Sequence, residues 1–211
     1  EALELQEKRL DALRQGAAPE VLLLLEHPPV ITLGRSGRLE HLLAPAAALE
    51  AGGIPVHRVS RGGDITFHGP GQLVGYLILD LARRGPPDVG RFLRAMERAL
   101  VEALALPGIR AHTRPGLTGV FLGPEFDPAQ PARKIASIGV GLRGWLTWHG
   151  FALNVGTDLA AFRAIVPCGL RDVTMTSAAQ ALGPAAPADL YLRVREAVAT
   201  IFSRRFAPPP T

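Results

Sequence analysis

The sequence predicts a single α/β (α+β) domain, residues 1–211, in which helices flank one mixed sheet. Strand-like segments cluster between helical segments at both ends and in the middle of the chain, without strict strand–helix alternation. The 211 residues are too few for two ordinary domains. Apolar residues make up 47% and charged residues 20%, a composition typical of globular proteins.

The chain begins with a predicted helical segment within residues 1–18. Its leucines at positions 3, 10 and 13 fall on one side of a helix. Residues 21–26 and 30–33 are predicted as short strands, because they are apolar and a double proline at 28–29 separates them.

A short helix is predicted over residues 45–51, since Gly52-Gly53 closes it, and a strand over 56–59. Residues 72–81 form a continuous apolar run with β-branched and aromatic members. Such a run is typical of a strand buried on both faces.

The clearest helix begins at Asp88, because apolar residues recur at helical spacing up to Pro107-Gly108. Residues 117–155 are strand-like, with a polar, proline-rich loop over 123–131. An amphipathic helix over 189–206 closes the fold, and residues 207–211 are expected to fray.

Composition excludes several classes of protein. The net charge of +4 is weak and scattered, which argues against nucleic acid and suits an acidic protein partner. No apolar run reaches the roughly 20 residues of a membrane helix, and no export signal is recognisable. One cysteine rules out an internal disulfide and a Cys-cluster zinc site. We therefore expect a cytoplasmic protein without a membrane segment.

A glycine-rich segment over residues 61–72 precedes the apolar run. It is neither a Walker loop, since no Gly-Lys-Ser/Thr follows, nor a dinucleotide fingerprint, since a strand follows where a helix should. A plain hairpin would explain the glycines. It would not explain Arg61, Thr66 and His68, which indicate a binding loop.

The only cysteine, Cys168, lies between Pro167 and Gly169. It is either a small buried apolar residue or a nucleophile. The neighbouring glycine would leave room for an acyl carbonyl and expose backbone N–H groups to an oxyanion. A free thiol is only a few per cent thiolate at neutral pH, so a nucleophile here needs a nearby cation or base.

Lys134 opens an apolar strand-like segment and is one of only two lysines, with Lys8, in an arginine-rich chain. A solvated lysine at a strand end is the alternative interpretation. Arginine cannot lose its proton in a protein, whereas a buried lysine can. Proton transfer therefore gives a physical reason for lysine at this position.

The segment over residues 148–154 contains His149, which is either a hydrogen-bonded strand residue or part of a site. His57, His68 and His149 lie far apart in the sequence, without the paired spacing of metal ligands. We therefore expect no metal site.

Together these segments resemble the octanoyltransferase (lipoyl(octanoyl) transferase) family of lipoate biosynthesis. The resemblance runs from Glu26 to about Ser177. Its most specific parts are Arg61-Gly62-Gly63, Thr66 to Gln72, Lys134-Ile135, Ser137-Ile138-Gly139, His149-Gly150, Ala152-Leu153-Asn154 and Pro167-Cys168-Gly169.

The resemblance implies a mixed, largely antiparallel sheet, as in lipoate-protein and biotin-protein ligases. It also implies an acyltransferase without cofactor, neither ATP nor metal. An octanoyl group on the phosphopantetheine of acyl carrier protein would pass to Cys168 as a thioester. It would then pass to a lysine of apo lipoyl domains, in 2-oxoacid dehydrogenase E2 subunits and the glycine cleavage H protein.

In the same family pattern, Cys168 and Lys134 form a Cys–Lys dyad, in which Lys134 activates the thiol and relays protons. The residues implied to bind substrate in an acyl tunnel are Arg61, Gly62, Gly63, Asp64, Ile65, Thr66, Phe67, His68, Ser137, Ile138, Gly139, His149, Gly150, Phe151 and Ala152. The dyad requires Lys134 and Cys168 to lie within hydrogen-bond reach, roughly 3 Å.

The sequence departs mildly from the family pattern. Phe67 stands where a tyrosine is common, Phe121 where a tryptophan is common, and Phe151 where a leucine is usual. Two rival functions stay open. An ATP-dependent lipoate or biotin ligase would not need the cysteine, and a non-catalytic acyl-binding protein would need neither Cys168 nor Lys134.

Overall fold

The computed structural model describes residues 1–123, 132–169 and 173–208. Its α-helices are α1 (Ala2–Arg14), α2 (Ala46–Ala51), α3 (Val89–Ala105), α4 (Ala178–Leu182) and α5 (Leu190–Arg205). Its strands are β1 (Val21–Leu25), β2 (Val30–Leu33), β3 (Val56–Arg58), β4 (Ile65–His68), β5 (Gln72–Ile78), β6 (Ala111–Arg114), β7 (Leu117–Leu122), β8 (Ala132–Arg143), β9 (Leu146–Asn154) and β10 (Val173–Met175).

Most strands of the described chain belong to one large sheet in the order β1-β5-β9-β8-β7-β6. The neighbours in this order are antiparallel. Strand β10 pairs in parallel with the first residues of β8. The predicted mixed, largely antiparallel sheet is therefore confirmed.

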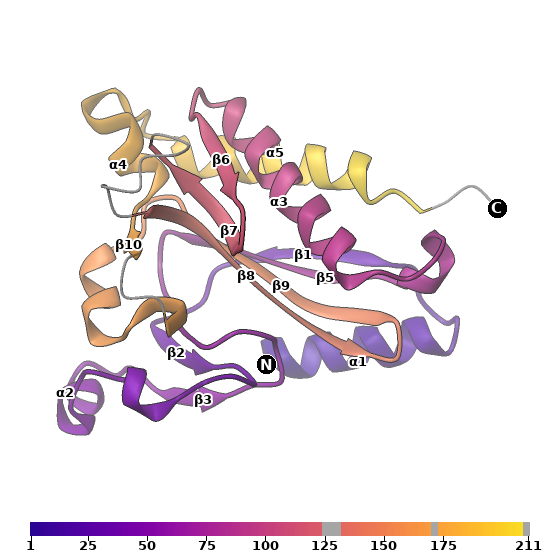
Figure 1. Cartoon of the computed structure of the whole chain (residues 1–211), viewed down its shortest axis with the longest axis horizontal. Coiled ribbons are helices and arrows are strands. Elements are labelled where there is room, and N and C mark those ends of the chain that lie inside the picture. The colour runs from indigo at the N-terminus through magenta and orange to yellow at the C-terminus, as the bar shows by residue number, and fades with distance from the viewer. Residues whose placement is uncertain (124–131, 170–172, 209–211) are drawn as a thin grey trace.

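A second, three-stranded sheet in the order β3-β2-β4 was not predicted. The two strands on either side of the double proline at 28–29 belong to different sheets. Strand β1 pairs in the large sheet, and β2 pairs in the small one. Strand β4 lies inside the glycine-rich segment and pairs antiparallel with β2. Figure 1 shows the small sheet beside the N-terminal end of α1.

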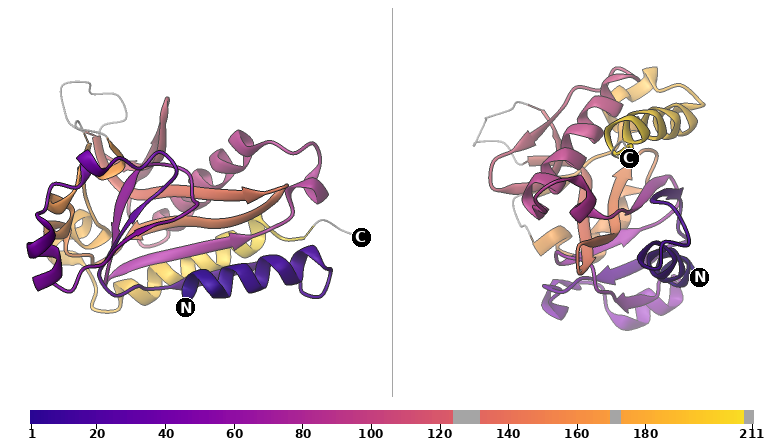
Figure 2. Two further views of the ribbon diagram at one scale, coloured as in Figure 1. Left: turned by 90° about the horizontal axis from the view of Figure 1, so that it is seen from below. Right: turned by 90° about the vertical axis from the view of Figure 1, so that its right-hand side faces the viewer.

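Helices cover both faces of the large sheet. Figures 1 and 2 show α1 on one side of the β8–β9 hairpin and α3 with α5 on the other. The main core lies under α3 and α5, where Met96, Leu100, Val198 and Phe202 are buried. On the opposite side, Leu10 and Leu13 of α1 pack with Ile78 and Trp148.

The predicted helix boundaries agree with local sequence signals. The Asp88 side chain caps α3 by accepting a hydrogen bond from the Arg91 N–H at 3.0 Å. Helix α5 buries Leu190, Val194, Val198 and Ile201. In α1, Leu10 and Leu13 are buried, whereas Leu3, near the start of the helix, is 39% exposed. Gln6, which accepts a hydrogen bond from the His149 N–H, is buried.

Two sequence-based predictions differ from the structure or lie outside it. The strand predicted over residues 72–81 ends at Ile78, and a 3-10 helix begins at Leu81. The predicted loop over 123–131, except Gly123, and the last three residues of the predicted tail lie outside the described residues.

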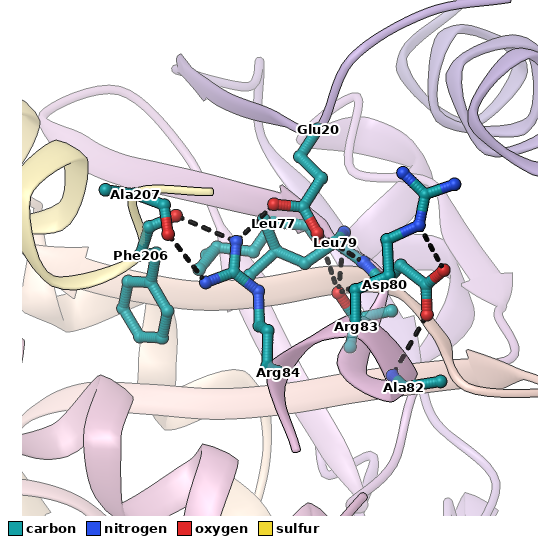
Figure 3. Close-up of polar contacts among 10 residues, drawn as sticks. Glu20, Leu77, Leu79, Asp80, Ala82, Arg83, Arg84, Phe206 and Ala207 are labelled. Atoms are coloured by element: carbon teal, nitrogen blue, oxygen red, sulfur yellow. Dashed lines mark hydrogen bonds and ion pairs between the residues drawn. The ribbon is translucent and has the colours of Figure 1, made fainter. Parts of the chain in front are cut away.

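A polar cluster around Arg84 joins the start of β1 to the end of α5 (Figure 3). Arg84 forms an ion pair with Glu20 and donates to the carbonyls of Phe206 and Ala207, both at 2.9 Å. Glu20 also accepts from the Asp80 N–H at 2.8 Å. A cation at the C-terminus of a helix stabilises it, because the last carbonyls lack partners within the helix.

Candidate active site

Lys134 and Cys168 are in contact, as the sequence predicts. The Lys134 Nζ lies 3.3 Å from the Cys168 Sγ, and the Ser137 Oγ lies 3.7 Å from the same sulfur. Lys134 is only 2% exposed, and Cys168 is partly buried. An amine so close to a thiol can accept its proton and then stabilise the thiolate.

A β-bulge in β8 places Lys134 and Ser137 on the same side. Residues three apart in a regular strand point to opposite faces. Here Phe121 of β7 pairs with Lys134 and the preceding residue, Val120, pairs with Ala136, so Ile135 is an extra residue in β8. The bulge turns both side chains toward the sulfur.

Lys134 also depends on a glycine in the neighbouring strand. Gly119 in β7 has φ +132°, and a Cβ at this position would lie 2.6 Å from the Lys134 Cε. Its N–H donates to the buried carboxylate of Glu97 at 2.8 Å. Burial raises the pKa of Glu97, while the Gly119 N–H, Arg94 and Lys134 oppose the increase. Gly119 therefore provides the space through which the lysine passes.

Cys168 occupies a short 3-10 turn, Pro167–Gly169, in an uncommon backbone conformation. Its φ of 57° is in the left-handed region, which costs energy for a residue with a side chain. The next residue, Gly169, also has positive φ, at 68°. Its N–H is bonded to the Val166 carbonyl at 3.0 Å. The N–H of Gly169 is thus engaged within the turn.

A cavity of about 800 Å³ opens beside the dyad, between the two sheets. Both Lys134 and Cys168 line it, as does the first turn of α1. The predicted substrate-binding residues that also line it are Arg61, Gly63, Asp64, Ile65, Thr66, His68, Ser137, Ile138, Gly139, His149, Gly150, Phe151 and Ala152. Segments far apart in the sequence therefore meet at one site.

Two predicted substrate-binding residues lie outside the cavity lining. Phe67 packs in a separate core under the small sheet, with its ring 5.7 Å from that of Phe162. It follows Thr66 in a strand, so its side chain points to the opposite face. Gly62 donates its N–H to the Val140 carbonyl at 2.7 Å, which fastens the glycine-rich loop to β8.

Arg61 is held rigidly in the cavity wall. Its guanidinium donates to the Thr32 carbonyl at 2.7 Å and to the Thr32 Oγ1 at 2.9 Å, and to the Gly62 carbonyl at 3.0 Å. Burial lowers the pKa of Arg61, and the nearby Cys168 and Asp64 oppose that shift. The positive charge of Arg61 thus interacts electrostatically with Cys168, and it lowers the pKa values of His68 and His149.

A chain of hydrogen bonds orients His68. Its Nδ1 is 2.8 Å from the Gln72 Oε1, and the Gln72 amide donates to the Asn154 Oδ1 at 2.9 Å. Burial lowers the pKa of His68 to about 3, and Arg61 adds to the effect. His68 is therefore neutral, with its proton on Nδ1 directed to Gln72.

His27, Tyr76 and His149 line the cavity near His68. The His27 Nε2 is 2.7 Å from the Tyr76 hydroxyl. Burial lowers the pKa of His27, burial with Arg61 and Arg35 lowers that of His149 to about 4, and burial raises that of Tyr76 to about 12. Neutral groups of this kind suit a pocket for an uncharged chain.

Several of these residues were missed by sequence reasoning. His27 lies between Glu26, where the family resemblance begins, and the double proline at 28–29, and Thr32 follows closely, so this segment could have indicated both. Tyr76 lies within an apolar strand that gave no sign of a cavity.

Within the described residues, His, Cys, Asp and Glu form no group of three or more able to hold a metal ion. No helix of that part is long and apolar enough to cross a membrane.

Comparison with known proteins agrees with this geometry. The family model of the lipoyl protein ligase A/B catalytic domain matches residues 1–202. An octanoyltransferase of Solibacter usitatus is 54% identical over 178 residues, 84% of this chain and 77% of that protein. An octanoyltransferase of Geobacter metallireducens is 48% identical over 186 residues, 88% of this chain and 80% of that protein.

Solved structures share the fold at lower identity. A lipoate protein ligase from an archaeal lipoylation system of Thermoplasma acidophilum superposes with a TM-score of 0.69 at 20% identity, over 95% of this chain and 79% of that one. A lipoate-protein ligase A bound with ATP gives 0.68 at 20% identity, over 94% and 81%. With the family model and the relatives near 50% identity, the conclusion is that this chain belongs to the octanoyltransferases, within the lipoyl protein ligase A/B catalytic domain family.

Proposed function

We propose that this chain transfers an octanoyl group from octanoyl-acyl carrier protein to a lysine of apo lipoyl domains, through a thioester on Cys168. The observation that carries the proposal is the 3.3 Å contact between the Lys134 Nζ and the Cys168 Sγ at the wall of the cavity. The names of the relatives supply the acyl group. An activated thiol and a buried amine are what thioester exchange requires.

In the first half-reaction the Cys168 thiolate attacks the thioester carbonyl of the donor. The new C–S bond to Cys168 forms, and the bond to the phosphopantetheine sulfur breaks. The leaving thiolate takes a proton from the Lys134 ammonium. Lys134 is then a neutral amine beside an acyl-enzyme.

In the second half-reaction the amine of the acceptor lysine attacks the acyl group on Cys168. The amide C–N bond forms, and the C–S bond breaks. The proton lost by the attacking nitrogen passes to Lys134, which restores the ammonium and the thiolate. Because the acyl group arrives as a thioester and leaves as an amide, neither ATP nor a metal is part of the proposal.

The cavity wall near the dyad is suited to an octanoyl chain. Val74 and Ala152, which pair on β5 and β9, line it. Ile65, Ile138 and Phe151 contribute to the lining too, although their side chains pack mainly into the two neighbouring cores. Burial of a methylene gains about 0.8 kcal/mol, so the chain as a whole contributes several kcal/mol to binding. Phe67, which lies in a separate core, is no longer part of this wall.

The acceptors we propose are the lipoyl domains of 2-oxoacid dehydrogenase E2 subunits and the glycine cleavage H protein. The net charge of +4 favours acidic partners such as acyl carrier protein. A cysteine that must stay a free thiol suits a reducing compartment, for which we propose the cytoplasm.

Intact-protein mass spectrometry tests the proposal directly. The protein is incubated with octanoyl-acyl carrier protein in the absence of ATP. We expect the mass of one octanoyl group to be added, to be removed by hydroxylamine, and to be absent from the Cys168→Ala variant. Addition of an apo lipoyl domain should then discharge the acyl-enzyme and transfer that mass to the domain.

Two other outcomes would replace the proposal. Labelling of the lipoyl domain only when ATP and free octanoate are supplied would indicate a ligase. Octanoyl retention without a covalent adduct, equal in wild type and Cys168→Ala, would indicate an acyl-binding protein.

A further inference from the structure

A carboxylate and a histidine lie directly beneath the Cys168 turn. Asp64 lies within the glycine-rich segment, and its Oδ2 is 2.6 Å from the Nδ1 of His41. The other oxygen, Oδ1, accepts from the backbone N–H groups of Ile65 at 2.7 Å and Arg38 at 3.1 Å. Both side chains are largely buried, with 18% of His41 and 11% of Asp64 exposed. This carboxylate is thus bound at both oxygens to one other segment of the chain, residues 38–41.

Gly169 brings this pair against the turn that carries the nucleophile. A Cβ at Gly169 would lie 2.6 Å from the Asp64 Oδ2 and 3.0 Å from the His41 Cε1. The glycine therefore makes room for the pair, where the sequence suggested room for an acyl carbonyl. The pair touches the residue adjacent to Cys168.

The backbone around His41 also holds the segment that leads into the turn. The His41 carbonyl accepts from the Val166 N–H at 2.8 Å. The N–H groups of Leu43 and Ala44 both donate to the Ala164 carbonyl, at 2.8 and 3.0 Å. Residues 41–44 and 164–166, the segment that leads into the Cys168 turn, are therefore held together by backbone hydrogen bonds.

We propose that His41 and Asp64 are a positioning pair, which holds the Cys168 turn so that the sulfur stays within reach of Lys134. The inference rests on the proposed function, since it concerns the same nucleophile. Cys168 has a left-handed conformation that its neighbours must maintain. The Nδ1–H of His41 fixes the Asp64 carboxylate, and the carboxylate with the imidazole ring supports Gly169 from below.

Two amide variants test the position of the hydrogen bond. The side-chain nitrogen of asparagine takes the place of the His41 Nδ1, and that of glutamine takes the place of Nε2. We expect His41→Asn to retain most activity. We expect His41→Gln to lower kcat by about 10²-fold with KM little changed, because misplacement of a reacting atom by 1 Å has an effect of that size.

Alkylation of Cys168 by iodoacetamide provides a second readout that needs no acyl donor. It should slow in His41→Gln and stay near the wild-type rate in His41→Asn. The control is Arg38→Ala, which removes an exposed side chain paired with Glu40 but keeps the N–H that binds Asp64. It should resemble wild type in both assays. Thermal unfolding of the two amide variants shows whether they fold equally well.

Equal kcat and equal alkylation rates for the two amide variants, whether both are high or both are low, would overturn the positioning role. If wild type fails to transfer octanoyl groups but the two variants still differ in alkylation, the proposed function fails and the positioning pair stands. The two hypotheses are therefore separable.

Discussion

Lys134 combines burial with proximity to the nucleophile. Its Nζ lies 3.3 Å from the Cys168 Sγ, and 2% of the residue is exposed. Arginine would keep the positive charge but cannot release a proton. We therefore expect Lys134→Arg to lower the rate of octanoyl transfer by about 10²- to 10⁴-fold, the usual contribution of a general acid–base group. Single-turnover transfer from the acyl carrier protein thioester measures it.

The other lysine provides the control for this substitution. Lys8 lies exposed on α1, so Lys8→Arg should transfer at the wild-type rate. A Lys134→Arg enzyme of near-normal activity would mean that only the positive charge at this position matters.

Gly119 allows a second prediction at the same scale. A methyl group there would lie 2.6 Å from both the Lys134 Cε and the Ala136 carbonyl. We expect Gly119→Ala to displace the lysine and to abolish most acylation of Cys168, measured by the rate of adduct formation in mass spectrometry.

Gly123 is the matched control, because it also has positive φ, at +100°, but none of the residues that the structure describes lies within 4 Å of a Cβ there. Gly123→Ala and Gly119→Ala both place a side chain on a backbone with positive φ, but only Gly119→Ala also brings a methyl group against Lys134 and Ala136. Equal losses in the two variants would assign the effect to strain instead of the lysine.

The two dyad residues could be predicted from sequence because their chemistry is unusual for their surroundings. A lone cysteine beside glycine and a lysine in an arginine-rich chain stand out without a structure. His41 does not stand out, since its role depends on Asp64, which lies 23 positions later and meets it only in the folded chain. Phe67 was misplaced because the resemblance was applied to the whole run from Arg61 to His68, whereas this run contains a strand with alternating faces.

At the scale of elements, a buried polar residue of α1 binds the sheet in addition to the apolar contacts of Leu10 and Leu13. The buried Gln6 accepts a hydrogen bond from the N–H of His149 at 2.8 Å. His149 has φ 57°, an unusual value for a strand residue. We expect Gln6→Ala to leave this buried N–H without its partner and to lower the free energy of unfolding by about 1–3 kcal/mol. Urea denaturation followed by circular dichroism measures the change.

Lys8→Ala serves as the reference in the same helix, because its side chain is exposed and the change favours helix formation slightly. A Gln6→Ala protein as stable as Lys8→Ala would show that the Gln6–His149 hydrogen bond contributes nothing net.

Amphipathic helices were the elements best predicted, since a period of 3.6 residues is visible over several turns in α3 and α5. The partition of β1 and β2 between two sheets was not predictable in this way. Two prolines show where a strand must stop, but the partner of the next strand depends on residues 65–68, which lie more than thirty positions away. The N-terminal helix was found, yet its buried glutamine resembled a surface residue.

For the whole molecule, the buried histidines predict acid sensitivity. The pKa of His68 is lowered to about 3 and that of His149 to about 4, chiefly by burial. Between those values and about 6.5 the unfolded chain binds protons that the folded chain does not. Stability should therefore rise with pH across this window and be lost as the pH falls, by up to about 1.4 kcal/mol per pH unit for each histidine.

Urea midpoints at pH 7, 6 and 5 test this prediction. His149→Gln should reduce the dependence on pH, while the same change at the exposed His57 should not. A wild-type midpoint that stays constant over this range would show that these histidines become protonated without unfolding.

The fold class followed from composition and from the distribution of helical and extended segments, because one large core of this length admits few arrangements. The cavity did not follow, since it is formed where two sheets and the first turn of α1 meet. The contact between these three elements depends on pairing of strands that are far apart in the sequence, and the local pattern of apolar residues does not indicate which strands pair.

The extra residue Ile135 has a consequence for how this site tolerates change. Whether two positions in a strand share a face depends on whether the number of steps between them is odd or even. Lys134 and Ser137 are an odd number of steps apart, and the bulge corrects the parity. Gaining or losing one residue between them would undo that correction, even if every chemical group were kept. Among related sequences, the length of this short stretch should therefore vary less than its composition.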